Sequence, residues 1–337
     1  MKKLATVITA AALTAAIPFG LPACGNEGVA EDTRLMAVEA TAVGTLDTCD
    51  YFVAAEPAAT TRANATGLNF VGDLQELYGS ENGYPQAVIV AKNELISDNA
   101  TFVQSFIDEV IANEAWLETA SAQTVIDALA SHLPEGATPT FNANNLTSQV
   151  ISNCGIHFVY AHEDKDRVTN FLAEMSAVDS SSVGTVSDRF FNDEDWTISG
   201  ASQEISVYAP DGAPALALAK LMSEENQFSQ TSVTYNIVAA NAIQGYVTGE
   251  APAADICILP LNAASKLVGS GETYTMLGTV TNGNLYILSR DDEQIIKDNI
   301  AELLTGKTVG VIQLANVPGL TLKIILSKYG IPYDTIG

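Results

Sequence analysis

The chain has 337 residues and carries 40 Asp and Glu residues against 15 Lys and Arg residues, so its formal net charge is -25 at pH 7. Hydrophobic residues make up 47% and charged residues 16%, a composition that excludes bulk disorder and supplies apolar surface for about two domains. An acidic surface repels phosphate groups. The charge therefore excludes sequence-independent nucleic-acid binding and argues against docking of the folded surface on anionic lipid.

Residues 1–24 have the pattern of an export signal. A basic start with two lysines precedes the small and apolar run Leu4–Gly20, and Leu21-Pro-Ala-Cys24 places a small residue before a cysteine. This ending resembles a bacterial lipobox, which implies cleavage before Cys24 and a lipid on its sulfur. We therefore expect an extracytoplasmic lipoprotein that is held at the bacterial cell membrane only through its N-terminal lipid. The alternative is an uncleaved transmembrane anchor, for which the apolar stretch is nearly long enough.

Three further cysteines follow, at Cys49, Cys154 and Cys257. Cys257 lies within the apolar segment Ile-Cys-Ile-Leu, which predicts a buried strand and an inert core thiol. Cys49 and Cys154 are either a disulfide of an exported protein or two separate thiols. The sequence has no Cys-x-x-Cys pair, which excludes a zinc ribbon or a thiol redox motif.

Strands and helices are predicted to alternate along the chain. In the first half we expect a helical turn over 37–43, strands over 50–55 and 86–92, and helices over 99–117, 122–131, 144–154 and 164–175. In the second half we expect strands over 205–210, 233–238, 255–259, 274–280, 285–289 and 309–313, and helices over 214–225, 241–248, 262–268, 295–304 and 317–329. This alternation predicts an α/β fold with mostly parallel sheets, in which ligands lie beyond the carboxyl ends of strands.

Two of the predicted strand-to-helix corners carry the features of a helix start. In the first, Asp211 is placed to cap a helix, Gly212 leaves the backbone open and Pro214 suits the first turn. In the second, Asn316 is placed as the cap and Pro318 lies just inside the helix. Free N–H groups at such corners favour a ligand, although each corner is also an ordinary capped turn.

Six segments together carry a resemblance to a known family. They are Asp211-Gly-Ala-Pro-Ala-Leu-Ala, Ala254-Asp-Ile-Cys-Ile-Leu-Pro-Leu-Asn-Ala-Ala264, Asn282-Gly-Asn-Leu-Tyr-Ile-Leu288, Thr308-Val-Gly-Val-Ile-Gln, Asp50-Tyr-Phe-Val-Ala-Ala-Glu-Pro-Ala-Ala-Thr60 and Gly83-Tyr-Pro-Gln-Ala-Val-Ile-Val-Ala-Lys92. The chain resembles the type II periplasmic binding proteins of ABC transporters. It is most similar to the branch that binds nitrate, taurine, aliphatic sulfonates and thiamine-pyrimidine precursors.

The order of these segments departs from the family. Residues 34–196 are similar to its second half and residues 204–337 to its first half, as in a circular permutation cut after Tyr333 and rejoined through Asp193–Gln203. The resemblance implies two lobes, each a mixed, mostly parallel sheet flanked by helices. Lobe one would cover 85–290 and lobe two 34–84 plus 291–337, with strands 86–92 and 285–289 as a two-strand hinge. A swap of halves with a second copy and an artificial segment order are the alternatives.

The resemblance implies capture of a small molecule between the lobes by hinge closure, followed by docking on an ABC permease of the inner or plasma membrane. We expect a monomer, with a swapped dimer as the alternative, and no metal, cofactor or catalysis. The ligand-binding positions carried over from the family are Asp211, Gly212, Ala213, Asn262, Thr281, Asn282, Asn284, Gln313, Ala315, Asn316, Glu39, Thr41 and Glu56.

The ligand class rests on opposing features of these positions. Helix N-termini favour a sulfonate or carboxylate, whereas Glu39 and Glu56 suit a heterocycle with amino groups, and the cleft motifs contain no Arg. We favour a heterocyclic vitamin precursor such as a thiamine pyrimidine, with an aliphatic sulfonate as second choice. Two alternatives remain: a pyrimidine-synthase-like enzyme of the same fold, whose cysteine run is missing here, and a ligand-sensing module without transport.

Overall fold

The computed structural model describes residues 31–38, 48–193, 200, 203–224, 228 and 231–336. Residues Glu31–Gly337 form one compact unit. The predicted export signal with Cys24, the positions Glu39 and Thr41, and most of the connection from Asp193 to Gln203 lie outside the described residues. In the part of the chain that is described, no helix is long and apolar enough to cross a membrane.

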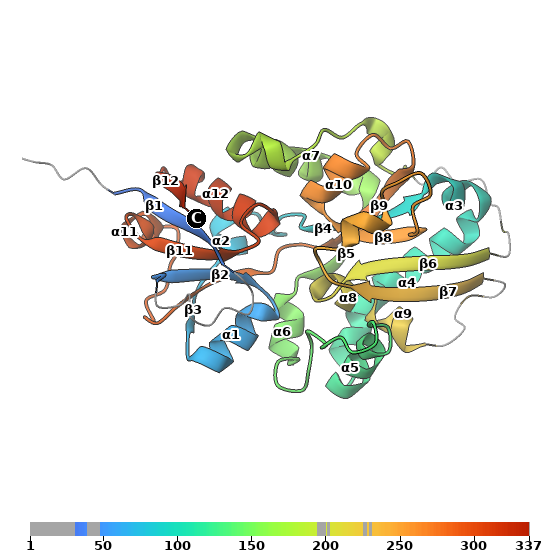
Figure 1. Cartoon of the computed structure of the whole chain (residues 1–337), viewed down its shortest axis with the longest axis horizontal. Coiled ribbons are helices and arrows are strands. Elements are labelled where there is room, and N and C mark those ends of the chain that lie inside the picture. Colours follow the sequence, from blue (N-terminus) through green and yellow to red (C-terminus); the bar gives the residue numbers. More distant parts are fainter. Residues whose placement is uncertain are drawn as a thin grey trace, which may run out of the picture. The chain divides into compact units, whose positions relative to one another are not determined.

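The fold is mixed α/β with two six-stranded mixed sheets (Figure 1). The first sheet has the order β12-β1-β11-β2-β10-β3, where the strands are β1 (Thr33–Val38), β2 (Tyr51–Ala55), β3 (Asn69–Asp73), β10 (Leu285–Ser289), β11 (Thr308–Ile312) and β12 (Tyr333–Ile336). The strands from β12 to β2 are parallel neighbours, and β10 runs antiparallel to both β2 and β3.

The second sheet has the order β5-β9-β4-β8-β6-β7, where the strands are β4 (Ala87–Lys92), β5 (Ile156–Tyr160), β6 (Gln203–Pro210), β7 (Thr231–Val238), β8 (Ile256–Pro260) and β9 (Tyr274–Thr281). Only the pairings of β6 with β7 and β8 are parallel. The pairings of β4 with β8 and β9, and of β5 with β9, are antiparallel. The expectation of a mostly parallel sheet is therefore wrong for the pairings of this sheet, because β4 and β5 run opposite to the other four strands.

Helices cover the two sheets. Those near the first sheet are α1 (Ala58–Thr66), α2 (Leu74–Tyr78), α11 (Ile300–Leu304) and α12 (Val317–Lys328). Those near the second are α3 (Asn93–Asp98), α4 (Ala100–Thr119), α5 (Ala122–Ala130), α6 (Ser148–Asn153), α7 (Ala161–Val178), α8 (Ala213–Leu216), α9 (Ala219–Ser223) and α10 (Leu261–Leu267), with 3-10 turns η2 (Ser180–Ser182), η3 (Asp188–Phe190) and η4 (Ile243–Tyr246). Helix α7 packs on β9 of the second sheet and also on α12 beside the first.

The chain passes between the sheets twice. It leaves the first sheet after α2 and enters the second at β4, and it returns through Asn282–Asn284 from β9 to β10. The central strands are buried along nearly their whole length, as their continuous apolar sequences require. One hydrophobic cluster contains side chains of both sheets, among them Val53 and Val311 from the first and Val88 and Leu259 from the second. The division into the two predicted lobes stays a prediction.

Helix 214–225 was expected to be continuous, and it is broken into α8 and α9 at Leu218. The cause is Asn113, a fully buried residue of α4. Its Nδ2 donates to the carbonyl of Leu216 at 3.1 Å, and its Oδ1 accepts from the backbone N–H of Lys220 at 2.9 Å. Leu216 and Lys220 are four residues apart, so the amide occupies the place of their helical hydrogen bond and breaks the ladder there.

Other boundaries were also wrong. Of the helical turn expected over 37–43, only Ala37 and Val38 are described, and they form the end of strand β1, where they pair with Val311 and Ile312 of β11. The expected helix 295–304 begins only at Ile300, since Asn299 accepts from the N–H of Ile296 and holds a turn before it. The expected helix 144–154 begins at Ser148, where Thr147 caps it through the N–H of Val150.

Candidate functional site

Both sheets end in polar corners that meet where the chain crosses between them. In the second sheet, the amino end of β4 lies between the carboxyl ends of β8 and β9, because Ala87 is paired with both Pro260 and Thr281. In the first sheet, the amino end of β10 lies beside the carboxyl end of β2, with Leu285 paired with Ala55. We call the polar residues at these corners the polar seam: Glu56, Gln86, Asn262, Thr281, Asn284 and Asn316.

Hydrogen bonds join seam residues that are far apart in the sequence. Asn262, at the start of α10, donates from Nδ2 to Oδ1 of Asn316 at 3.4 Å and to the carbonyl of Ser182 at 3.3 Å. Asn284 accepts from the N–H of Glu56 at 3.0 Å through its backbone carbonyl, and its Nδ2 lies 3.5 Å from the carbonyl of Glu56. The structure therefore brings together five of the thirteen positions expected to bind ligand: Glu56, Asn262, Thr281, Asn284 and Asn316.

The seam contains buried oxygen atoms without a hydrogen-bond partner among the described residues. They are Oδ1 of Asn262, Oγ1 of Thr281, Oδ1 of Asn284 and Oε1 of Gln86. The side chains of Asn262, Thr281 and Asn284 are 3%, 1% and 2% exposed. Each buried polar group left without a partner costs about 1–3 kcal/mol. Four such atoms at the ends of neighbouring strands are therefore a destabilising arrangement that a ligand with hydrogen-bond donors would relieve.

Gln86 was not among the expected positions. Its backbone N–H donates to the carbonyl of Thr281 at 2.9 Å, and its carbonyl accepts from the N–H of Leu261 at 3.0 Å. These two bonds place it between the corners that carry Thr281 and Asn262. The available signal was a polar residue at the first position of an otherwise apolar strand, after Pro85.

Glu56 is 2% exposed and its carboxylate is already satisfied. It accepts from the N–H of Thr60 at 3.1 Å and from the Thr60 hydroxyl at 2.7 Å, and Asn153 Nδ2 lies 3.3 Å away. The carboxylate of Glu56 is therefore occupied by bonds within the protein, and its role toward a ligand stays a prediction. Through these bonds the carboxylate of Glu56 holds the first turn of α1. The nearby Cys154 thiol is buried, and this burial, followed by the negative charge of Glu56, raises the pKa of the thiol. Cys49, Cys154 and Cys257 are free thiols, and Cys257 is fully buried as expected.

The corner after β6 is built differently from the expectation. The N-cap of α8 is Gly212, whose φ of 112° and ψ of −149° suit glycine, and no side chain caps this helix. Asp211 does not cap it. Its Oδ2 instead accepts from the N–H and hydroxyl of Thr140 at 3.1 and 2.6 Å. Ala213 is buried at the first helical position.

A chain of hydrogen bonds leads from this corner to the first sheet. Asn145 Nδ2 donates to the carbonyl of Thr140 at 2.8 Å and to the hydroxyl of Thr61, in α1, at 2.9 Å. Thr140 in turn holds Asp211. The Asp211 corner therefore contributes a second polar contact between elements of the two sheets, separate from the seam.

The corner after β11 presents its backbone and side chains to the surface. Gln313 is exposed and has a φ of 58°, which is uncommon for a residue with a side chain. Its carbonyl accepts from the N–H of Asn316 at 2.9 Å, and Ala315 between them is exposed. Asn316 is the N-cap residue of α12, but its side chain makes no capping bond, which leaves it free to accept from Asn262.

Asn282 is directed toward α7 and β5. Its Oδ1 accepts from Nη2 of Arg167 at 2.5 Å, and its Nδ2 donates to the carbonyl of His157 at 2.7 Å. It lines a cavity of about 480 Å³ together with Asn82, Glu114 and His157. A direct role of Asn282 in the seam stays a prediction.

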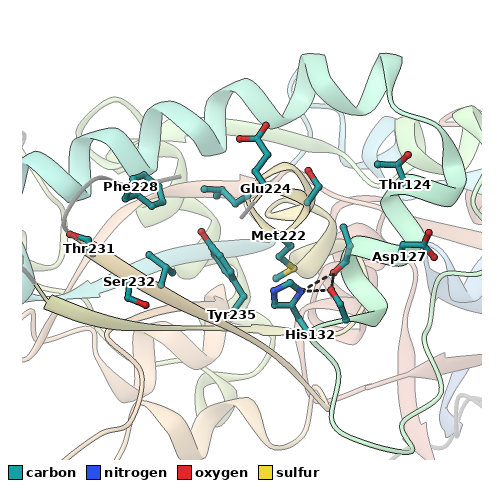
Figure 2. Close-up of a pocket in the computed structure, with 14 residues that line it drawn as sticks. Thr124, Asp127, His132, Met222, Glu224, Phe228, Thr231, Ser232 and Tyr235 are labelled. Atoms are coloured by element: carbon teal, nitrogen blue, oxygen red, sulfur yellow. Dashed lines mark hydrogen bonds between the residues drawn. The ribbon is translucent and has the colours of Figure 1, made fainter. Parts of the chain in front are cut away.

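A larger cavity, of about 710 Å³, lies at the amino end of β7 between α5 and α9 (Figure 2). His132 and Tyr235 line it, and their rings meet edge to face with centroids 5.6 Å apart. Burial, followed by the charges of Glu109 and Glu224, raises the pKa of Tyr235. Its hydroxyl is buried without a partner among the described residues. The strands of the seam meet at the opposite, carboxyl end of β6 and β8, and sequence reasoning did not find this cavity.

No family model matches the chain, and no curated protein matches it either. Among solved structures, the chain is similar to the oligopeptide-binding protein AppA from Bacillus subtilis in complex with a nonapeptide, with 8% sequence identity and a TM-score of 0.23. The alignment covers 71% of this chain and 51% of AppA, so the chain spans about half the length of that protein. A likeness at this TM-score supports no inference about the ligand.

Proposed function

We propose that the protein is a solute-binding protein that captures a small organic molecule at the polar seam. The observation that carries this proposal is the set of buried, unpartnered oxygens of Gln86, Asn262, Thr281 and Asn284 at strand ends of both sheets. Two mixed sheets joined by two chain crossings are the arrangement that the resemblance to type II periplasmic binding proteins implies. Contacts of one ligand with both sheets would favour a closed state over an open one.

The chemistry of the seam favours a ligand rich in hydrogen-bond donors. The unpartnered atoms are amide oxygens and one hydroxyl, and the seam has no Arg, Lys or His to neutralise an anion. A heterocycle with amino groups, such as a thiamine-pyrimidine precursor, is therefore our first choice. An aliphatic sulfonate is the second, since the N-terminus of α12 adjoins the seam through Asn316.

We further propose that the chain works outside the cytoplasm as a lipid-anchored component of an ABC importer, in the order export, lipidation at Cys24, ligand capture and delivery to a permease. This role rests on the sequence pattern of residues 1–24 and on the family resemblance. We propose binding without catalysis. Among the described residues, no group of three or more His, Cys, Asp and Glu side chains is placed to hold a metal ion.

A thermal-shift screen of residues 25–337 tests the proposal. The panel contains aminopyrimidines, thiamine, flavins, taurine, alkanesulfonates and nitrate. A ligand at 100 times its dissociation constant stabilises a fold by about 2.7 kcal/mol, which is a readily measured shift. We expect a shift with aminopyrimidines; a shift with alkanesulfonates alone would reverse our choice of ligand.

Two matched variants locate the site. Thr281→Val removes an unpartnered buried hydroxyl from the seam, and Tyr235→Phe removes one from the cavity beside β7. We expect Thr281→Val to weaken binding and Tyr235→Phe to leave it unchanged. The opposite pattern would move the site to that cavity, and a cooperative melt without any shift across the panel and its close analogues would count against solute binding.

A further inference from the structure

Three backbone segments touch where the chain crosses between the sheets. A Cβ atom at Gly83 would lie 2.1 Å from the carbonyl oxygen of Asn282, and one at Gly155 would lie 2.2 Å from the carbonyl oxygen of Gly283. Gly83, Gly155 and Gly283 all have positive φ, at 64°, 61° and 87°. The two crossings and the residue before β5 therefore pack backbone against backbone, in conformations that only glycine adopts freely.

One side chain of α7 binds both crossings. Arg167 donates from Nη1 to the carbonyl of Asn82, in the first crossing, at 3.0 Å. It donates from Nη2 to Oδ1 of Asn282, in the second crossing, at 2.5 Å. A planar guanidinium has its donors in a fixed fork, so these two bonds set the distance between the crossings.

Arg167 is itself held in place by a buried carboxylate. Asp164, one turn earlier in α7, is 2% exposed and accepts from Nε and Nη2 of Arg167 at 2.5 and 3.0 Å. The hydroxyl of Thr279, in β9, donates to the same carboxylate. Phe171 continues this side of α7 and stacks on Tyr84 of the first crossing, with ring centroids 5.2 Å apart. Helix α7 thus fixes the guanidinium against the second sheet on one side and against the crossing on the other.

We propose that Arg167 is a positioning residue that clamps the two crossings and thereby sets how far the sheets open at the polar seam. This inference rests on the proposed function, since it assigns the clamp to ligand capture. Rotation of one sheet against the other must change backbone angles within Asn82–Gln86 and Asn282–Asn284. The guanidinium binds one residue of each segment, so it resists such changes until its bonds are released.

The test measures hydrogen exchange of the ligand-free chain, residue by residue, in three variants. Arg167→Lys keeps the charge beside Asp164 but removes the fork. Asn282→Ala removes the contact between Arg167 and the second crossing, together with the bond from Asn282 to the carbonyl of His157, and leaves the ion pair intact. Arg34→Lys, on the exposed surface of β1, is the matched control. The reporting amides are those of residues 86 and 282, which donate to Thr281 and Gly155 at 2.9 and 2.8 Å, and their exchange is compared as protection factors so that the replacement of Asn282 does not itself alter the result.

We expect Arg167→Lys and Asn282→Ala each to raise exchange at these two amides about tenfold, and their combination to add little, because both break one clamp. Exchange in the central strands of both sheets and the melting temperature of Arg34→Lys stay as in the unmodified chain. A purely structural role would instead raise exchange throughout the second sheet, and that result, or unchanged exchange at the crossings, overturns the clamp.

If Arg167→Lys melts without cooperativity, the double variant Asp164→Asn/Arg167→Gln removes both charges together and supplies the same comparison. No ligand is added in these measurements. A failed ligand screen would therefore count against the proposed function and leave the clamp standing. If a ligand binds but exchange at the crossings is unchanged in the variants, the proposed function is supported and the clamp is refuted.

Discussion

Two threonines of β9 allow the unpartnered hydroxyl of the seam to be tested directly. Thr279 and Thr281 are two residues apart and are 0% and 1% exposed. Thr279 donates to Oδ2 of Asp164, whereas Oγ1 of Thr281 has no partner among the described residues. Valine has the shape of threonine without the hydroxyl, so the two Thr→Val variants differ mainly in the hydrogen bond that is lost.

Thr281→Val should stabilise the ligand-free protein by about 1–2 kcal/mol, because it removes the desolvation cost of a buried hydroxyl without breaking a bond. Thr279→Val should destabilise it by about 1.5–3 kcal/mol, the value of a hydrogen bond to a charged group. The two variants should therefore differ by about 2.5–5 kcal/mol. Urea unfolding measures this difference as opposite shifts of the midpoint with an unchanged slope.

The same measurement is repeated with the ligand that the screen identifies. We expect Thr281→Val to lose part of the ligand-induced stabilisation that the unmodified chain shows, so that stability and binding change in opposite directions. If Thr281→Val destabilises the ligand-free chain as much as Thr279→Val does, the hydroxyl of Thr281 has a partner, and the interpretation of the seam as a site prepared for a ligand is refuted.

Two further predictions concern the elements around the seam. Gly319→Ala should destabilise the chain by about 1–3 kcal/mol through overpacking, because a Cβ there would lie 1.9 Å from the carbonyl oxygen of Leu314 in the corner before α12; an unchanged urea midpoint would contradict the placement of that corner. Asp179→Asn should destabilise the chain by up to about 1 kcal/mol at pH 7, because hydrogen bonds from Ser181 and Ser182 and the charge of Lys323 lower the pKa of Asp179. A lowered pKa in the folded state gives stability that is present above the unfolded-state pKa and lost as the pH falls through the folded-state pKa. The difference between Asp179→Asn and the unmodified chain should therefore shrink as the pH falls through the folded-state pKa of Asp179, and a pH-independent difference would point to another cause.

The sequence predicted the apolar strands well because their signal is local. Strands such as Ile256–Pro260 and Thr308–Ile312 are continuous runs of buried side chains between turn residues, and both were found to within one or two residues. The direction in which each strand runs within its sheet was harder to predict from the sequence. The antiparallel entry of Ala87–Lys92 into the second sheet depends on residues that are distant in the sequence, and no local pattern records it.

The candidate site shows the same limit. Asn262, Asn284 and Asn316 were named through the family resemblance, which placed them at strand-to-helix corners or turns. The sequence also predicted that Asp211 caps a helix, whereas its carboxylate accepts a hydrogen bond from Thr140 instead. This partner lies 71 residues earlier in the chain, so the local sequence gives no sign of it. The broken helix has the same cause: the insertion of Asn113 between Leu216 and Lys220 comes from a separate helix. In both cases a side chain from a distant part of the sequence takes the place of a local hydrogen-bond partner. The helix and turn propensities of neighbouring residues contain no information about such a contact.

The positions in the sequence of the strands that form each sheet also determine the order in which the two sheets can fold. Every strand of the second sheet comes from residues 87–281, so this sheet can be completed before the last part of the chain has been made. The first sheet pairs Arg34 with Thr308, and Thr33 with Tyr333, so β1 has neither neighbour until the chain has been made as far as β11 and β12. Pairings of this separation close slowly, and unpaired strands are prone to aggregation while they wait. Strand β1 therefore waits for β11 and β12, and until they are present it is an unpaired strand open to association with other chains.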